Sequence, residues 1–165
     1  MSILKADLLQ ELFLAIDMED LDLVKDLMAE GLDVDSQDED GETILMKAIN
    51  YGTEDMVEYL LKVYKPDVNA VANDGSTALS LAVVQNDYQL ARDLMKYGVD
   101  INLPDKTGET PLINAVYSDS EDMVTFLVEN GADTKARTGY GWTALMCAKS
   151  CGNRDIIEYL ERLCK

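Results

Sequence analysis

An acidic run over residues 33–42 contains the side chains best suited to binding a cation. Its segment Asp-Glu-Asp-Gly, residues 38–41, has the pattern found at the centre of an EF-hand calcium loop. With the glycine at loop position 6, however, Ser36 takes position 1 and Lys47 takes position 12, where the loop requires a bidentate glutamate. Because lysine cannot serve as a ligand there, the pattern argues against a calcium site.

Three cysteines could in principle supply thiolate ligands. Cys147 and Cys151 lie four residues apart, as on one face of a helix, and Cys164 is the third. Structural zinc usually takes four ligands, and the chain contains no histidine, so no metal or cofactor is expected. An odd number of cysteines confined to one end of the chain is not typical of a disulfide framework and favours a reducing cytoplasm.

Catalytic motifs are missing from the sequence. Without histidine there is no ordinary serine or cysteine triad, and neither a Gly-x-Ser-x-Gly elbow nor a Gly-Lys-Ser/Thr phosphate loop occurs. Carboxylates on a solvated surface titrate normally and do no chemistry by themselves. We therefore expect a protein that is not an enzyme; a turnover screen would test the remaining hypothesis, catalysis by surface carboxylates.

The formal net charge of -18 is distributed unevenly along the chain. Residues 1–37 carry ten acidic side chains against two lysines, whereas residues 137–165 carry five basic against three acidic. Such a field repels phosphate backbones and anionic lipid and favours a basic protein partner. The alternative is that the charge only keeps the protein soluble and monomeric.

No targeting or membrane segment is evident from the sequence. The apolar runs are shorter than the about 20 residues that span a bilayer. Residues 1–20 contain five acidic side chains, which is unlike a secretory signal, although a signal removed beforehand stays open.

An internal repeat organises the chain. A glycine, a threonine two residues on, a leucine two further and an alanine three further recur four times, with glycines 34, 33 and 33 residues apart. The extra residue of the first interval lies near Val63. The aligned segments are residues 39–45, 73–79, 106–112 and 139–145.

Each repeat predicts two helices. The glycine suits a tight turn and the threonine is a good helix N-cap, so a short helix is expected to begin at each threonine. These helices are expected to end where a left-handed residue is tolerated, at Gly52, Asn86, Asp119 and Gly152. A one-sided apolar pattern follows each, and Gly98 and Gly131 end two of these second helices. Because no unit buries its apolar face alone, the units must stack.

The repeats predict a single domain, residues 1–165. A capping repeat at residues 5–37 has Leu8 in place of the turn glycine, as suits a unit with no predecessor. The internal repeats are expected at residues 38–71, 72–103 and 104–136, with a C-terminal capping repeat at residues 137–165.

Over essentially its whole length the chain resembles the ankyrin repeat family. The family pattern is Asp-x-x-Gly-x-Thr-Pro-Leu-His-x-Ala, a second helix and Gly-Ala-Asp-x-Asn, and residues 131–133 reproduce the end of it. The resemblance implies an all-α solenoid of stacked helix-turn-helix units with short β-hairpin-like turns. Proline after threonine survives only at Pro111, and the family histidine is replaced, which implies a weaker turn network. The replacements are Met46, Ser80, Ile113 and Met146.

The resemblance also implies a binding scaffold that uses its turn tips and the concave surface of its first helices. On this chain the turn tips include Glu39, Asp40, Glu42, Asn73, Asp74, Ser76, Lys106, Glu109, Tyr140 and Trp142. The first-helix positions include Asn50, Tyr51, Gln85 and Tyr117.

These observations lead to one functional hypothesis and one alternative. The first is a cytoplasmic, monomeric scaffold, adaptor or inhibitor that docks a basic protein, with exposed aromatics such as Tyr117 and Trp142 supplying most of the affinity. The alternative is a nucleic-acid mimic or toxin-neutralising, immunity-type protein. Competition by DNA for the captured partner would separate the two.

Overall fold

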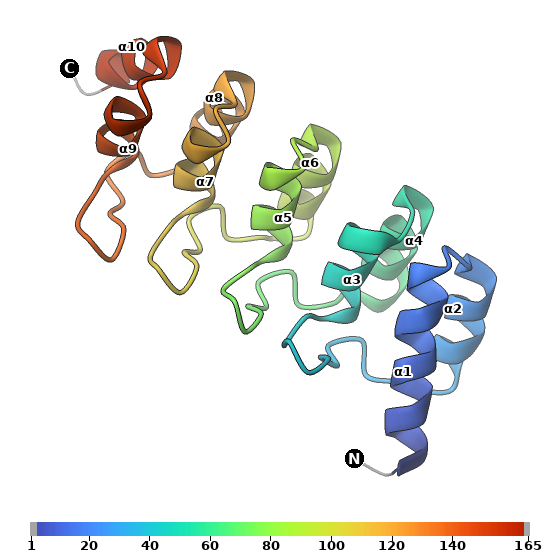
Figure 1. The fold of residues 1–165 in the computed structure, drawn as a ribbon. Coiled ribbons are helices and arrows are strands. Elements are labelled where there is room, and N and C mark those ends of the chain that lie inside the picture. The colour runs from blue at the N-terminus through green and yellow to red at the C-terminus, as the bar shows by residue number, and fades with distance from the viewer. Residues whose placement is uncertain (1–2, 164–165) are drawn as a thin grey trace. The chain divides into compact units, whose positions relative to one another are not determined.

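A computed structural model describes residues 3–163 of the chain. The chain divides into two compact units, with the boundary between Asn73 and Asp74. We call the part up to Asn73 unit 1 and the part from Asp74 onward unit 2. Within each unit, helices lie in pairs joined by turns (Figure 1). The single domain that the sequence predicts stays a prediction.

Unit 1 contains the N-terminal repeat and the first internal repeat. Helix α1 (Ile3–Asp17) packs against α2 (Leu21–Ala29) and α3 (Ile44–Tyr51), and α3 contacts α4 (Glu54–Tyr59). Helix α1 runs through Leu8, where later repeats have their turn glycine, so the first repeat has a longer helix in place of the turn. The core of unit 1 includes the fully buried Leu12, Ile16, Met28, Leu45 and Leu60.

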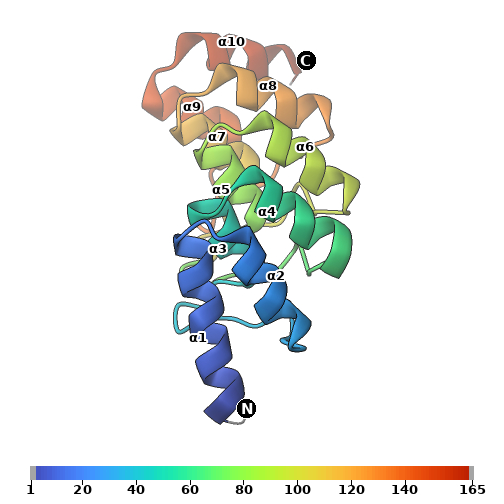
Figure 2. The ribbon, with the colours of Figure 1, turned by 90° about the vertical axis from the view of Figure 1, so that its right-hand side faces the viewer.

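Unit 2 contains three helix pairs. The pairs are α5 (Ala78–Val84) with α6 (Tyr88–Lys96), α7 (Pro111–Tyr117) with α8 (Glu121–Glu129), and α9 (Ala144–Cys151) with α10 (Arg154–Leu163). In each pair the first helix contacts the second, and the first helices contact one another in the order α5, α7, α9. The second helices α6, α8 and α10 form the other layer of the unit (Figure 2).

The repeating threonines begin the first helices, as the sequence predicts. Each threonine has extended backbone, and its hydroxyl accepts a hydrogen bond from the amide three residues later. Such a cap contributes about 1 kcal/mol, because it satisfies an amide that the helix leaves unpaired. The capping threonines are Thr43, Thr77, Thr110 and Thr143.

The extra residue of the first internal repeat is absorbed inside a helix. Helix α4 continues as a π-helical turn, η1 (Leu60–Tyr64), where the sequence places the insertion near Val63. Such π turns occur mostly as single-turn bulges within α-helices, where they accommodate an extra residue. Lys65 then takes the left-handed conformation with φ 51°, the role that Gly98 has with φ 84° in the next repeat.

The first helices end where the sequence predicts, at or next to Gly52, Asn86, Asp119 and Gly152, but the left-handed conformation expected at these residues is confirmed at three and wrong at one. Asn86, Asp119 and Gly152 have positive φ, but Gly52 is extended, with φ -91° and ψ -165°. The glycine is needed there for space: a Cβ on Gly52 would lie 2.8 Å from the Ala48 carbonyl oxygen and 2.9 Å from the Met56 sulfur.

The all-α fold class is confirmed. Over residues 3–163 the structure has helices and turns, and the extended pairing is limited to two isolated antiparallel bridges, Gln37 with Thr43 and Arg137 with Thr143. These bridges close hairpin-like turns immediately before α3 and α9. Within the described part of the chain, no helix is long and apolar enough to cross a membrane.

Candidate partner-binding site

Side chains, rather than the family histidine, hold the turns in shape. Asp38 Oδ1 accepts the amides of Asp40 and Glu42, each at 2.9 Å. In unit 2, Asp105 Oδ1 accepts the amides of Thr107 and Glu109, each at 2.8 Å. In both turns the carboxylate thus closes the turn from the first position, and the weaker turn network implied by the missing histidine stays a prediction.

In the remaining turns, hydroxyl side chains form the stabilising hydrogen bonds. Thr138 Oγ1 accepts the amides of Tyr140 and Trp142 at 3.3 and 3.2 Å. Ser80, at the family histidine position, completes a capping box: its hydroxyl accepts the Thr77 amide at 2.8 Å while its own amide donates to the Thr77 hydroxyl at 3.1 Å. The turn tips are therefore presented by ordered backbone.

The turn before α3 holds an internal cation. Lys47 Nζ lies 2.9 Å from Asp38 Oδ2 and 2.6 Å from Glu42 Oε2, and all three side chains are less than 20% exposed. The same ammonium lies 5.4 Å from the ring centre of Tyr51 and 6.0 Å from that of Phe13. We call Asp38, Glu42 and Lys47 the lysine clamp.

The pKa values of the clamp follow from this geometry. Burial alone would lower the pKa of Lys47, but hydrogen bonds and charge attraction from Glu42 and Asp38 raise it well above its ordinary value. For Asp38, burial acts to raise the pKa, and the Lys47 hydrogen bond together with the turn amides outweighs it, so the pKa is lowered. Both charged forms are thus favoured in the folded protein.

Several predicted site residues of unit 1 are engaged within the unit. Asn50 Nδ2 donates to Glu42 Oε1 at 3.0 Å, next to the clamp. Asn73 donates its amide to the Asp40 carbonyl at 2.8 Å and its side-chain Nδ2 to the Glu39 carbonyl at 3.0 Å. The carboxylates of Glu39 and Asp40 remain exposed at the tip, and Tyr51 is 52% exposed beside Lys47.

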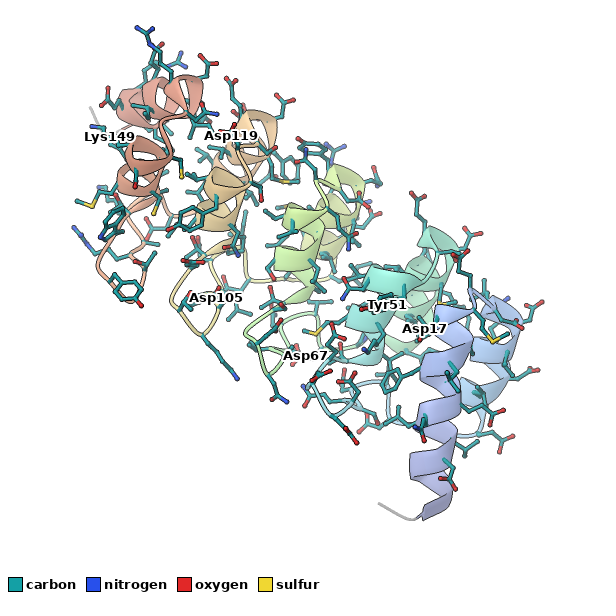
Figure 3. All side chains as sticks on the ribbon, in the orientation of Figure 1. Asp17, Tyr51, Asp67, Asp105, Asp119 and Lys149 are labelled. Atoms are coloured by element: carbon teal, nitrogen blue, oxygen red, sulfur yellow. The ribbon has the colours of Figure 1, made fainter. Side chains whose placement is uncertain are left out.

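Unit 2 carries a groove of about 340 Å³ between α5, α7 and their turns. Among the predicted site residues the structure brings Asp74, Ser76 and Tyr117 together there, and Figure 3 shows Asp105 in the turn that precedes α7. The lining residues are Asp74, Ser76, Ser80, Leu81, Val84, Asp105, Asn114, Tyr117 and Ser118.

Carboxylates of the groove region differ in their surroundings. Asp74 accepts the Ser76 amide at 2.8 Å and the Ser76 hydroxyl at 2.9 Å. Bonds from Ser76, opposed by burial and aided by the nearby charge of Lys106, lower the pKa of Asp74. In contrast, burial and then the neighbouring Asp105 charge raise the pKa of Glu109.

The other predicted residues of unit 2 lie outside the groove lining. Tyr140 is 88% exposed and Trp142 is 44% exposed at the last turn, so both are accessible. Gln85, Lys106 and Glu109 also lie outside it; Gln85 and Lys106 are exposed, and Glu109 is half-buried.

Tyr117 contacts the last helix pair through Cys147 of α9. Its hydroxyl lies 3.3 Å from the Cys147 sulfur, and its ring is 47% exposed. This contact, followed by burial, raises the pKa of Tyr117 well above its ordinary value. Cys147 is buried and Cys151 is exposed, so the two thiols have different surroundings, and Cys164 lies outside the described residues.

Sequence reasoning missed the groove-lining Asp105, Asn114 and Ser80 as functional candidates. A signal was present in the repeat alignment, because Asp105 aligns with Asp38 and Asn114 aligns with Lys47. The depth of the groove depends on side-chain packing, which no alignment of the repeats reveals.

Comparison with protein families agrees with this architecture. A family model described as "Ankyrin repeats (3 copies)" matches residues 12–105 and residues 83–163. Together the two matches span residues 12–163, which include the capped helices and the turns described above. The chain belongs to the ankyrin repeat family.

Proposed function

We propose that this protein is a binding scaffold, an adaptor or an inhibitor, that docks a basic protein partner through its acidic turn tips and first-helix surfaces. Ankyrin repeats are generally protein-interaction scaffolds and are typically not enzymes. The proposal includes a monomeric protein acting in the cytoplasm, in keeping with its cysteine usage and net charge of -18.

The observation that carries the proposal is the combination of exposed aromatic rings with carboxylates on ordered turns. Tyr51, Tyr117, Tyr140 and Trp142 are each at least 44% exposed. Aromatic side chains are enriched among the residues that dominate binding energy. Turns fixed by internal hydrogen bonds lose little entropy when a partner binds.

Capture of the partner from the native host, followed by kinetics on the purified pair, tests the proposal. Electrostatic steering predicts an association rate that falls between about 0.1 and 1 M salt, where the Debye length drops from about 10 to 3 Å. An unchanged association rate would contradict the role of the acidic surface.

Two further experiments test the role of the aromatic surface and the alternative of a nucleic-acid mimic. Tyr117→Ala and Trp142→Ala are each expected to weaken binding by about 2 kcal/mol or more, the loss that defines an interface hot spot. Undiminished binding by both variants would place the interface elsewhere. Competition by double-stranded DNA for the captured partner would instead favour the mimic.

A further inference from the structure

The turns before α3 and α7 share one backbone framework. In unit 1 the Asp38 amide donates to the Glu42 carbonyl at 3.0 Å, and in unit 2 the Asp105 amide donates to the Glu109 carbonyl at 2.9 Å. Each aspartate also accepts the amide of its glutamate through Oδ1. Both turns therefore hold an aspartate and a glutamate in the same local arrangement.

The two turns differ in what faces the carboxylates from the helix. Four residues after the capping threonine, α3 has Lys47 and α7 has Asn114. In unit 1, Oδ1 of the aspartate holds the turn while Oδ2 pairs with the lysine. In unit 2, Asp105 Oδ1 holds the turn in the same way, and among the side chains that the structure describes, residues 7–163, no ion pair joins a lysine or arginine to Asp105 or Glu109.

The pKa of Glu109 also reflects the lack of a paired cation in this turn. The pKa of Glu109 is raised by burial and by the Asp105 charge, with a smaller opposing effect from Thr107. A positive charge placed beside these carboxylates would remove that unfavourable interaction. A cation beside these two carboxylates would therefore be favoured in unit 2.

Space for such a cation comes from a second difference. In unit 1 the ring of Phe13, one repeat before α3, lies against the lysine clamp. The aligned residue before α7 is Ser80, which is small and hydrogen-bonded into its own helix cap. Both Ser80 and Asn114 line the groove.

We propose that this groove receives one lysine or arginine side chain of a partner protein, with its cation beside Asp105 in the role that Lys47 has in unit 1. This inference rests on the proposed protein-binding function. The apolar wall of Leu81, Val84 and Tyr117 suits the aliphatic stem of such a side chain. The ring of Tyr117 offers the kind of contact that Tyr51 makes with Lys47.

The size of the groove leaves room for one long side chain. Its volume of about 340 Å³ is near the lower limit of about 300–1,000 Å³ for ligand pockets. A small free cation would find the carboxylates but would leave the apolar wall uncovered, which is why we favour a protein segment.

Titration of the ¹⁵N-labelled full chain with short capped peptides tests the proposal. The probes are acetyl-Leu-Arg-Leu-amide and acetyl-Leu-Lys-Leu-amide, with acetyl-Leu-Gln-Leu-amide as the neutral control and spermidine as the free cation. We expect saturable amide shifts at Ser76, Thr107 and Ser118 with the two cationic peptides, and at least about tenfold weaker binding of the neutral peptide, equal to 1.4 kcal/mol. Equal binding of all three peptides, or tighter binding of spermidine, would overturn the proposal.

Two variants localise the binding. Asn114→Lys should place the protein's own ammonium beside Asp105 and lower the affinity for the cationic peptides about tenfold. The matched Asn114→Gln should leave that affinity unchanged. Asp105→Asn keeps an oxygen for the turn amides but removes the charge. It should weaken binding of the cationic peptides by a similar factor. Retained spectra of each variant would establish folding, and unchanged peptide binding by both Asn114→Lys and Asp105→Asn would exclude this groove.

The test is separable from that of the proposed function. If a captured partner binds wild type and Asn114→Lys equally, the scaffold function stands and the groove assignment fails. If the peptides bind as expected but no basic partner is captured, the groove assignment stands and the proposed function fails.

Discussion

Two equivalent turns of this molecule each hold an aspartate and a glutamate, but only one of them pairs these carboxylates with a lysine. In unit 1, Asp38 and Glu42 share the ammonium of Lys47 at 2.9 and 2.6 Å. In unit 2 the neutral Asn114 stands at the position of Lys47, and Asp105 and Asn114 line an open groove. The difference shows that one repeat framework can hold its carboxylates with an internal ion pair in one turn and without one in another.

Removing the clamp lysine should have the largest effect. Lys47→Met leaves two carboxylates that are less than 20% exposed without their cation. We expect a loss of about 2 kcal/mol in the free energy of unfolding, below the about 3–5 kcal/mol of a fully buried pair. Urea unfolding monitored by circular dichroism measures this loss.

The matched control for this variant is in unit 2. Asn114→Met removes no ion pair, so it should change the free energy of unfolding by less than about 0.5 kcal/mol. Similar losses for Lys47→Met and Asn114→Met would show that the two turns do not differ as described.

Introducing a lysine into unit 2 should have a smaller effect of opposite sign. Asn114→Lys should form bonds to Asp105 and Glu109 and raise the free energy of unfolding by about 1 kcal/mol, somewhat below the usual range for hydrogen bonds to charged groups. Thermal and urea unfolding check this, with Asn114→Gln as the neutral control. A destabilised Asn114→Lys would mean that the carboxylates cannot close on an ammonium.

The two turns should also differ in the sign of their pH dependence, which we expect to be the smallest effect. Asp38 has a lowered pKa, so its charge stabilises the fold above its unfolded value near pH 3.9, and this contribution is lost as the pH falls through the folded pKa. Glu109 has a raised pKa, so its charge weakens the fold at neutral pH, and the penalty disappears as the pH falls below about 4.

Single neutral substitutions separate these contributions. Asp38→Asn should be less stable than wild type at pH 7 and nearly equal to it at about pH 2, while Glu109→Gln should be slightly more stable at pH 7 and nearly equal below about pH 4. Urea midpoints measured across this pH range check both. A stability loss of similar size from both variants at pH 7 would refute the opposite signs.

The helix framework was predictable from sequence because local chemistry sets it. Thr43 and Thr110 cap their helices as predicted, since a threonine hydroxyl three residues before an amide needs no tertiary contact to do so. The insertion near Val63 was located, but its π-helical form was not, because a longer loop would give the same alignment. Gly52 was misjudged, since its role depends on the closeness of Met56 rather than on its own dihedral.

The candidate site was predictable only in part. Exposed aromatics such as Tyr117 and Tyr140 were anticipated from their variable positions in the repeat. The lysine clamp and the groove were missed, because each depends on side chains from different parts of the repeat meeting in space. The alignment of Lys47 with Asn114 does carry the difference between the two turns, since a lysine in one repeat is replaced by a neutral amide in the other.

Site-resolved carboxyl titration by NMR tests the central comparison most directly. In wild type, the pKa of Glu109 should lie above its ordinary value, and in Asn114→Lys it should fall below that value because a cation now faces it. In Lys47→Met, the pKa of Asp38 should rise from its lowered position. Unchanged Glu109 and Asp38 titrations in these variants would contradict the account.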